Sequence, residues 1–488
     1  MGGTEGLFAG HSIVITDDVM ANYRCQGGFD LLGRSVDRLQ GEESYQAVTK
    51  VCQTLKLDGL VLLGGSKTST DAAYFAEYLR QENVIKTTIV CVPLTITGSI
   101  QNQFVEATVG FDTASKLTAQ IVGNNQTDGA SAKKYYYFQR LMGQEPSHLA
   151  LEVALATKPN YTLIAEEIEK NNDTLADIVK SIADMVEERA NQGKNYGSVV
   201  IPEGLIESIP EIKVLLQELD AAYASAAAAS GTLTGEKLRE ELTMWSKALL
   251  DSLPEYMQAQ LLWQRTHANR IDISQAETER LLAHFVDLEL SHRKRIGTYK
   301  GNFSVVCSFI GYQARGAMPS NFDVNYAYNL GAVTTVLIAN DFSGYMATMH
   351  NLKAPVDQWQ AGGVPITALM MTTGGGTRPV VPNSKIELQS ASYQSFANRK
   401  STWAVDDCYE NPGPLQFFGP TSHRSTETLH LESFEYLQDV RGLYTALQNI
   451  TEQCRPGCSS TVLRAATSSL GALTNVLHLV SEAEANKK

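Results

Sequence analysis

The stretch Gly59-Leu-Val-Leu-Leu-Gly-Gly-Ser-Lys-Thr-Ser69 is a short apolar run that ends in two glycines. A helical pattern precedes it at 44–57, and a second helical pattern follows at about 70–81. Short apolar runs that are bounded by glycine or proline and separated by helices indicate βαβ units. The stretch therefore predicts an α/β fold with mostly parallel sheets.

The same alternation of strand and helix signals continues along the chain. We expect further strands at 87–92, 161–165, 198–201, 303–310, 333–338 and 364–370. We expect helices at about 112–124, 146–156 and 174–192. The regular spacing extends the α/β prediction to most of the sequence.

One long segment, from about 210 to 298, carries no strand signals. Within it, 221–230 consists almost entirely of alanine and serine. Ser274 and Glu277 have the spacing of a capping box, and apolar residues follow them. We therefore expect a helical insertion in which one helix begins near Ser274.

The end of the chain, after about Phe434, is also helical in pattern. Apolar residues recur there at steps of three and four: Leu463, Ala466, Leu470, Leu473, Leu477 and Val480. Such spacing places them in one stripe on one helix face. We expect this stripe to pack against the body of the protein or a partner subunit.

Composition and charge narrow the class of protein. The chain has 488 residues, a net charge of −13, 43% hydrophobic and 19% charged residues, which is typical of a soluble globular protein. A strongly acidic chain predicts neither a nucleic-acid surface nor attraction to anionic lipid. The sequence contains no run of about 18 apolar residues, so it predicts no membrane-spanning helix.

The cysteines and the N-terminus indicate the compartment. Seven cysteines are scattered without a paired framework, which favours a reducing compartment. Cys454 and Cys458 have no second Cys or His pair at zinc spacing nearby, so ordinary thiols are favoured over a metal site. The N-terminus lacks a basic patch followed by an apolar stretch, and we expect a cytoplasmic protein.

Two loops are candidates for binding a phosphate: Gly64-Gly65-Ser66-Lys67-Thr68-Ser69 and Pro93-Leu-Thr-Ile-Thr-Gly-Ser99. A glycine pair between a strand and a helix can hold an anion, because backbone N–H groups converge at the electropositive helix end. Both loops carry hydroxyls, and the first carboxylate beyond the glycine pair is Asp71. Mg²⁺ prefers carboxylate oxygens, so an anion site without metal or a plain tight turn are the two interpretations.

Polar residues further along could bind a sugar phosphate. Lys133 and Lys134 precede an aromatic run, where they are either ligands or solvated strand-end lysines. Glu203 follows a strand and could bind sugar hydroxyls or cap the next helix. Arg315, near Tyr312, could bind a phosphate or form a surface ion pair.

Together these motifs resemble those of phosphofructokinases in order and spacing, over nearly the whole chain. The shared motifs are the Gly64-Gly65 loop, Pro93–Ser99, Val109-Gly-Phe-Asp-Thr113, Tyr137-Phe-Gln-Arg-Leu-Met-Gly143, Ile201-Pro-Glu-Gly-Leu-Ile-Glu207 and Gly311-Tyr-Gln-Ala-Arg-Gly316. Gly344-Tyr-Met-Ala-Thr348, Asn351-Leu-Lys353 and Tyr409-Glu-Asn-Pro-Gly-Pro-Leu-Gln-Phe417 resemble the long, plant-type pyrophosphate-dependent branch. The resemblance implies two three-layer lobes with mostly parallel sheets, plus the helical insertion and the helical tail.

The departures from the family pattern fall on the residues of its chemistry. Ser66 stands where active members carry the aspartate that serves Mg²⁺ and the phosphate donor. In the second loop, Leu94 replaces the lysine that favours pyrophosphate, Thr97 replaces the catalytic base, and Ser99 replaces a further carboxylate. Gln144 replaces an arginine that contacts fructose 6-phosphate. The resemblance therefore implies a chain with no catalytic residues and no metal ligands.

The sugar side of the family pattern is mostly kept. The matching residues are Lys134, Tyr135, Met142, Gly143, Glu203, Tyr312 and Arg315. In the family, the positions of Lys134 and Tyr135 reach the site of a neighbouring subunit. The combination resembles the alpha subunit that assembles with a catalytic beta subunit as an α2β2 heterotetramer activated by fructose 2,6-bisphosphate.

The resemblance thus implies a regulatory subunit that binds fructose 2,6-bisphosphate or fructose 6-phosphate in the cytosol, and acts in glycolysis. It implies no cofactor on this chain, with Mg²⁺ in the catalytic partner. Two alternatives are a weakly active pyrophosphate-dependent kinase with an unrecognised base, and a structural scaffold.

The resemblance also predicts how the lobes divide the chain. Residues 1–128 and about 317–366 would form the phosphate-donor-type lobe. Residues 129–316 would form the sugar-phosphate lobe, and 367–488 the rest of that lobe and the tail. Family members have another strand and a Pro-Gly-Gly-type loop before the segment that matches Met1–Ala9, so a shortened donor lobe is expected.

Overall fold

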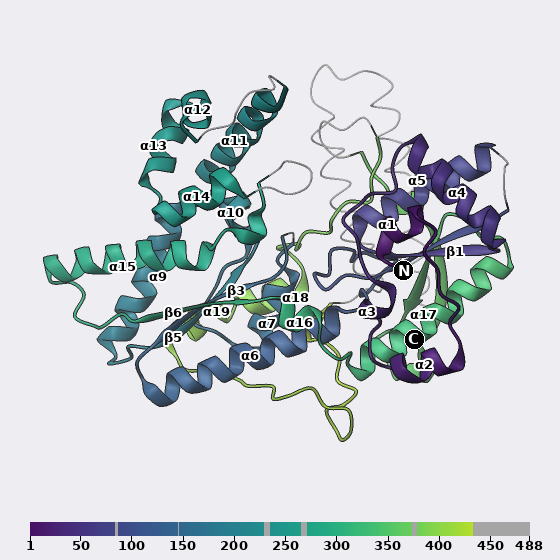
Figure 1. Cartoon of the computed structure of the whole chain (residues 1–488). Coiled ribbons are helices and arrows are strands. Elements are labelled where there is room, and N and C mark those ends of the chain that lie inside the picture. Colours follow the sequence, from purple (N-terminus) through teal and green to yellow (C-terminus); the bar gives the residue numbers. More distant parts are fainter. Residues whose placement is uncertain (83–85, 145, 229–234, 265–270, 373–377, 433–488) are drawn as a thin grey trace, which may run out of the picture. The chain divides into compact units, whose positions relative to one another are not determined.

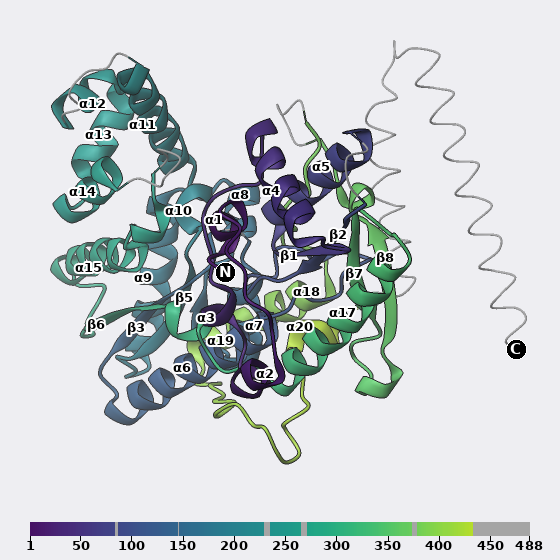
Figure 2. The same cartoon turned by 45° about the vertical axis from the view of Figure 1, so that its right-hand side comes forward.

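Two four-stranded sheets form the framework of the protein (Figures 1 and 2). A computed structural model describes residues 1–82, 86–144, 146–228, 235–264, 271–372 and 378–432. Met1–Leu431 form one compact unit, and Glu432–Lys488 are a separate unit. The predicted helical tail after Phe434, its apolar stripe, Cys454 and Cys458 lie outside the described residues.

The first sheet has the strand order β1-β2-β7-β8. Its strands are β1 (Gly59–Gly64), β2 (Thr88–Pro93), β7 (Tyr345–His350) and β8 (Gln360–Pro365). β1, β2 and β7 are parallel, and β8 pairs antiparallel with β7. Helices α4 (Glu42–Leu55) and α5 (Ser66–Glu82) lie on one face, and α17 (Asn321–Ala339) lies on the other (Figures 1 and 2).

The second sheet has the order β4-β5-β3-β6, and all its strands are parallel. They are β3 (Tyr136–Leu141), β4 (Tyr161–Thr162), β5 (Gly197–Pro202) and β6 (Val305–Ile310). Helices α9 (Leu175–Asn191) and α15 (Thr278–Ile296) cover one face, while α6 (Phe111–Ala132) and α7 (His148–Thr157) cover the other (Figures 1 and 2). The prediction of an α/β fold with three layers and mostly parallel sheets is confirmed.

Successive residues of the second sheet feed two separate apolar cores, because side chains alternate across a strand. Val199 and Ile201 of β5 pack in the core shared with α9 and the insertion. Val200, between them, packs in the core shared with α6 and α7. Burial on both faces explains why β5 is a short apolar run in sequence.

The predicted helical insertion at 210–298 is confirmed for the part that the structure describes. It contains α11 (Pro210–Ala228), α12 (Gly235–Glu241), α13 (Met244–Ser252), α14 (Glu255–Trp263), the 3₁₀ turn η1 (Ile273–Gln275) and α15. The predicted capping box is wrong. The Ser274 hydroxyl lies in η1 and donates to Asp272 at 2.5 Å, and α15 begins only at Thr278.

The predicted strand at 333–338 is also wrong, because these residues belong to α17. β-Branched residues favour strands only weakly, and tertiary packing overrides that preference. Ser320 caps the helix by accepting from the Asp323 amide. Leu330, Val333 and Leu337 are buried at helical spacing. The expected strand at 364–370 is mostly the 3₁₀ turn η3 (Ile366–Leu369), and β7 was not predicted as a strand.

The remaining elements are short, and most of them lie at the two ends of the described chain. They are α1 (Gly3–Phe8), α2 (Asp17–Tyr23), α3 (Phe29–Leu32), α8 (Ala165–Asn171), α10 (Leu205–Ser208), α16 (Tyr312–Arg315), η2 (Val356–Gln358), α18 (Ala391–Ala397), α19 (Lys400–Val405) and α20 (Glu427–Leu431). Within the described ranges, no helix combines the length and hydropathy that a membrane crossing requires. The lobe boundaries near 128, 317 and 366 stay a prediction.

Glu152 of α7 ties the last described helix to the body. Its two carboxylate oxygens accept from the backbone amides of Glu427 and Thr428 at the start of α20, each at 2.7 Å. Burial raises the pKa of Glu152 to about 7, although these two hydrogen bonds act in the opposite direction.

This pKa predicts a dependence of stability on pH. Between the ordinary carboxyl pKa and about 7, the folded protein binds the Glu152 proton more tightly than the unfolded chain. The stability that this proton contributes is therefore greatest below the ordinary carboxyl pKa. The free energy of unfolding then falls by about 3 kcal/mol as the pH rises from that value to about 7. Urea denaturation of the wild type and Glu152→Gln at several pH values measures this, and equal pH slopes would contradict it.

Candidate functional site

The carboxyl ends of β3, β5 and β6 meet at one level of the second sheet. Leu141 pairs with Pro202 on one side and with Ile310 on the other. The next residues of the three strands, Met142, Glu203 and Gly311, therefore lie side by side. Ligands of α/β proteins bind outside the carboxyl ends of the strands, so this edge is the candidate site.

Glu203 is held at this edge by its neighbour Gly143. The Gly143 amide donates to Glu203 Oε2 at 2.7 Å, and Gly143 has a φ of 140°, which favours glycine. Glu203 is 2% exposed, and among the described residues its Oε1 has no hydrogen-bond partner. Burial raises the pKa of Glu203, whereas the Gly143 amide and Arg140 lower it. Among the described residues, no amide of α10 donates to Glu203, and Glu203 Oε1 faces the guanidinium of Arg140.

Arg140 on β3 balances the charge of this buried carboxylate. Its Nη1 lies 3.5 Å from Glu203 Oε1, and its Nε donates to Glu279 Oε2 of α15 at 2.7 Å. The guanidinium also stacks on the Phe309 ring, 4.2 Å from its centre. The sequence interpretation missed this role of Arg140 and Glu279, since a pair 139 residues apart leaves no local pattern.

Arg315 adds a cation to the same edge. Its guanidinium lies 4.9 Å from the centre of the Tyr312 ring, and no carboxylate forms an ion pair with it within the described ranges. Burial and the neighbouring Arg34 lower the pKa of Arg315, while Tyr312 and Glu203 raise it. The structure thus disfavours the ion-pair interpretation. A guanidinium without a counter-ion suits a phosphate, which it can bind through two parallel hydrogen bonds.

The two candidate phosphate loops also lie together. β1 and β2 pair in parallel so that Gly64 lies opposite Pro93, and the Leu94 amide donates to Gly64 O at 3.0 Å. A Cβ atom on Gly65 would lie 3.7 Å from Ser99 Oγ. The first loop is shorter than expected, because α5 begins at Ser66 and includes Lys67.

Thr97 connects these loops to the sugar-side residues. A Cβ atom on Gly143 would lie 3.2 Å from Thr97 Cγ2. The Thr97 hydroxyl forms a hydrogen bond of 2.9 Å with the Thr95 hydroxyl. A threonine hydroxyl is a poor general base, and among the described residues no carboxylate bonds to that of Thr97.

The residues of these loops do not fit Mg²⁺. Ser66, Thr97 and Ser99 offer only hydroxyls, whereas Mg²⁺ prefers carboxylate oxygens. The nearest acid along α5 is Asp71, whose two oxygens accept from Arg38 at 2.7 and 2.6 Å. No group of three or more His, Cys, Asp or Glu suited to a metal occurs in the described part of the chain.

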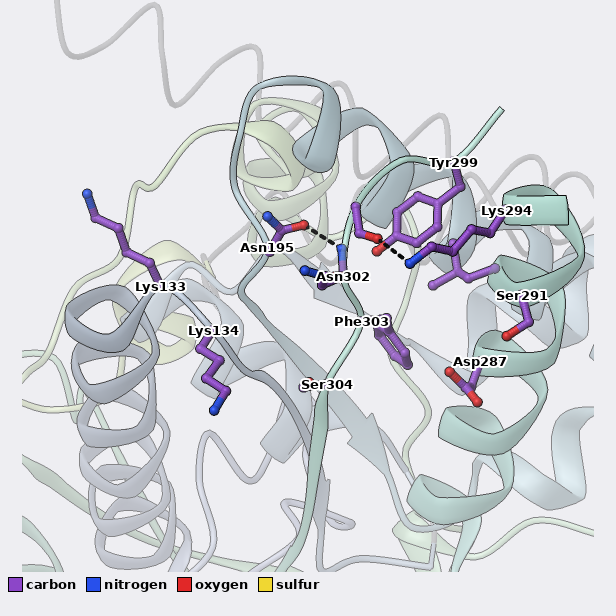
Figure 3. A pocket seen from close by; sticks show the side chains of 12 residues that line it. Lys133, Lys134, Asn195, Asp287, Ser291, Lys294, Tyr299, Asn302, Phe303 and Ser304 are labelled. Carbon is purple, nitrogen blue, oxygen red and sulfur yellow. Dashed lines mark hydrogen bonds between the residues drawn. The ribbon is translucent and has the colours of Figure 1, made fainter. Parts of the chain in front are cut away.

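Lys134 and Tyr135 lie elsewhere, because they precede β3 and so belong to the amino end of the second sheet. Lys133 and Lys134 line a cavity of about 390 Å³ together with Asp287 and Lys294 of α15 (Figure 3). The structure therefore does not bring Lys134 and Tyr135 to Glu203 and Arg315 of the same chain. Their contact with a neighbouring subunit stays a prediction.

Comparison with known proteins shows the family of this chain. The sequence profile described as phosphofructokinase matches residues 1–338. The chain belongs to the phosphofructokinase family. The resemblance inferred from the loop motifs is thereby confirmed.

Relatives of this phosphofructokinase chain include both subunits of one plant enzyme. The potato (Solanum tuberosum) protein named pyrophosphate–fructose 6-phosphate 1-phosphotransferase subunit alpha is 42% identical over 99% of this chain and 78% of its own length. The subunit beta from the same plant is 38% identical over 88% of this chain and 75% of its own length. A pyrophosphate-dependent phosphofructokinase structure from Nitrosospira multiformis has a TM-score of 0.49 and 13% identity, with 85% of this chain and 82% of that one covered.

The buried charges at the sugar-side edge predict a large effect of Arg140→Met. Removal of the guanidinium leaves Glu203 and Glu279 buried without their cation, which should lower the free energy of unfolding by about 3–5 kcal/mol. Urea denaturation at neutral pH measures this loss. Arg280→Met is the matched control, because exposed Arg280 pairs with Glu277, and its loss should cost less than about 1 kcal/mol. Similar losses for both variants would contradict the prediction.

Proposed function

We propose that this chain is the non-catalytic, regulatory subunit of a pyrophosphate-dependent 6-phosphofructokinase. In this proposal it assembles in the cytoplasm with a catalytic beta subunit, as a heterotetramer, and confers activation by fructose 2,6-bisphosphate on that partner. The partner interconverts fructose 6-phosphate plus pyrophosphate and fructose 1,6-bisphosphate plus phosphate in glycolysis, and holds the Mg²⁺. The observation that carries the proposal is the contrast between the intact Glu203–Arg315 edge and the hydroxyl-lined loops beside it.

The loops give the argument against catalysis by this chain. Phosphoryl transfer to a sugar hydroxyl needs a group that accepts the proton and cations that neutralise the transferred phosphate. Loss of a general base alone commonly lowers the rate by a factor of about 10² to 10⁴. Thr97 supplies no such base, and Ser66 supplies no metal ligand, so the two losses act on the same step.

The sugar-side edge gives the argument for ligand binding. Glu203 Oε1 accepts no hydrogen bond among the described residues, although it lies 3.5 Å from Arg140 Nη1, and the Arg315 guanidinium forms no ion pair there. A carboxylate suits sugar hydroxyls, and a guanidinium suits a phosphate. The names of the relatives, which include an alpha and a beta subunit, support a complex of two kinds of chain.

The proposal predicts that the purified chain is inactive alone. With pyrophosphate or ATP, fructose 6-phosphate and Mg²⁺, it should give no turnover above the background of the assay. Clear turnover by the chain alone would overturn the proposal in favour of a weakly active kinase. Calorimetry with fructose 2,6-bisphosphate should show binding, whereas a pure scaffold would show none.

A second prediction concerns Arg315→Ala in the mixed enzyme of both subunits. Removal of a phosphate-binding guanidinium should abolish activation by fructose 2,6-bisphosphate, while the subunits still co-purify. Activity of the mixed enzyme measured against effector concentration tests this. Arg280→Ala is the matched control, since its guanidinium also stacks on a tyrosine, 4.3 Å from the Tyr256 ring centre, but lies in the insertion. Unchanged activation in Arg315→Ala would contradict the assignment.

A further inference from the structure

The N-terminus of α5 presents unpaired backbone donors. The first amides of any helix lack partners within the helix, and together they form its electropositive end. Among the described residues, no carbonyl or side chain accepts from the amides of Ser66, Lys67 or Thr68; the first bond of this end is from the Ser69 amide to Gly65 O, at 2.9 Å. At 17 residues, α5 is long enough for this end to attract an anion.

Ser99 is a second and independent feature that faces this helix end. Its side chain is only 6% exposed, yet its hydroxyl has no hydrogen-bond partner within the described ranges. The hydroxyl oxygen lies 3.7 Å from the point where a Cβ atom of Gly65 would be. Ser99 Oγ is not sealed from solvent like the fully buried unpaired oxygens of this protein, so beside the open face of Gly65 the hydroxyl can donate to a ligand.

The charges around this helix end favour an anion. Lys67 in the first turn is exposed and forms no ion pair among the described residues. Asp71, one turn further along, is neutralised by Arg38 and also accepts from Gln40 at 3.1 Å. Arg38 also donates from Nη2 to Lys67 O, at 3.3 Å.

The helix end is also held in place. Residues 379–384 pass along its first turns and bond to it at several points. The Ser66 hydroxyl donates to Pro382 O at 3.3 Å, and the Val381 amide donates to Thr70 Oγ1 at 3.0 Å. On the Ser99 side, the Ser384 amide donates to Ser99 O at 2.9 Å. These bonds fix the distance between the α5 amides and the Ser99 hydroxyl before any ligand arrives.

We propose that the amides of Ser66, Lys67 and Thr68, the Lys67 ammonium and the Ser99 hydroxyl bind a phosphate group without a divalent cation. These groups are all hydrogen-bond donors or cations, so they complement a phosphate dianion directly. The lack of fit to Mg²⁺ and the fit to phosphate have the same origin, since hydroxyls stand where the family carries carboxylates. A carboxylate would repel the phosphate unless a metal ion lay between them.

Two sources could supply the phosphate group. One is inorganic phosphate. The other is the second phosphate of a sugar bisphosphate whose first phosphate binds Arg315, because Thr97 beside this site contacts Gly143 beside Glu203. The second source rests on the proposed function, whereas the first does not.

Calorimetry on the full chain, in the presence of EDTA, tests the proposal with inorganic phosphate, fructose 6-phosphate, and fructose 1,6- and 2,6-bisphosphate. We expect phosphate or a bisphosphate to bind without metal, and excess Mg²⁺ not to strengthen binding. Ser99→Asp should raise the dissociation constant of that ligand at least about tenfold. Ser99→Ala, which removes only one donor, should raise it about threefold to tenfold. Ser44→Asp, an identical change in the first turn of α4, is the matched control and should have no effect.

The outcomes separate the sources and the hypotheses. Loss of phosphate binding in Ser99→Asp identifies inorganic phosphate as a ligand. If Ser99→Asp loses binding of a bisphosphate but still binds fructose 6-phosphate as the wild type does, the ligand at this site is the second phosphate of the bisphosphate. Binding that requires Mg²⁺, binding that is indifferent to both Ser99 variants, or no binding of any of these ligands overturns the proposal. Circular dichroism confirms that each variant is folded, and no beta subunit is present, so failure here is independent of the activation assay.

Discussion

The parallel pairing of β3 with both β5 and β6 is the constraint from which the candidate site follows. Because Leu141 pairs with Pro202 and with Ile310, the chain leaves the three strands at one level. The backbone pairing alone therefore makes Met142, Glu203 and Gly311 neighbours, and no side-chain contact is needed to place them. A slip of one residue would turn every side chain of a strand to its other face, so the two apolar cores that flank the sheet fix this register.

This arrangement buries the charge of Glu203, which is unfavourable, and a residue of the helical insertion helps to balance the buried charges. Glu203 lies at the strand ends with little exposure, and Arg140 provides the cation that keeps it tolerable there. Glu279 then balances Arg140 from α15, at the far end of the insertion. The insertion therefore has a direct electrostatic connection to the site, in addition to the apolar core that it completes.

The contrast between the two halves of the site is a contrast in charge. The sugar-side edge keeps one carboxylate and one guanidinium, both positioned by backbone bonds and ring stacking. The two loops beside it expose helix-end amides and hydroxyls, and their nearest carboxylate is already paired with Arg38. Hydroxyls and helix-end amides are poor ligands for Mg²⁺ but can donate hydrogen bonds to an anion. Thr97, against Gly143, is where these two halves meet.

The sequence by itself determined the α/β class, the helical insertion and the set of candidate residues, because strand and helix periods and loop motifs are local patterns. It failed where tertiary contacts outweigh local preference: 333–338 are helical within α17, and Ser274 bonds to Asp272 instead of capping α15. Only the tertiary structure decided that Lys134 lies at the opposite end of the sheet from Glu203, and that Arg140 pairs with Glu279. These facts depend on strand register and on packing between distant segments, which no local pattern encodes.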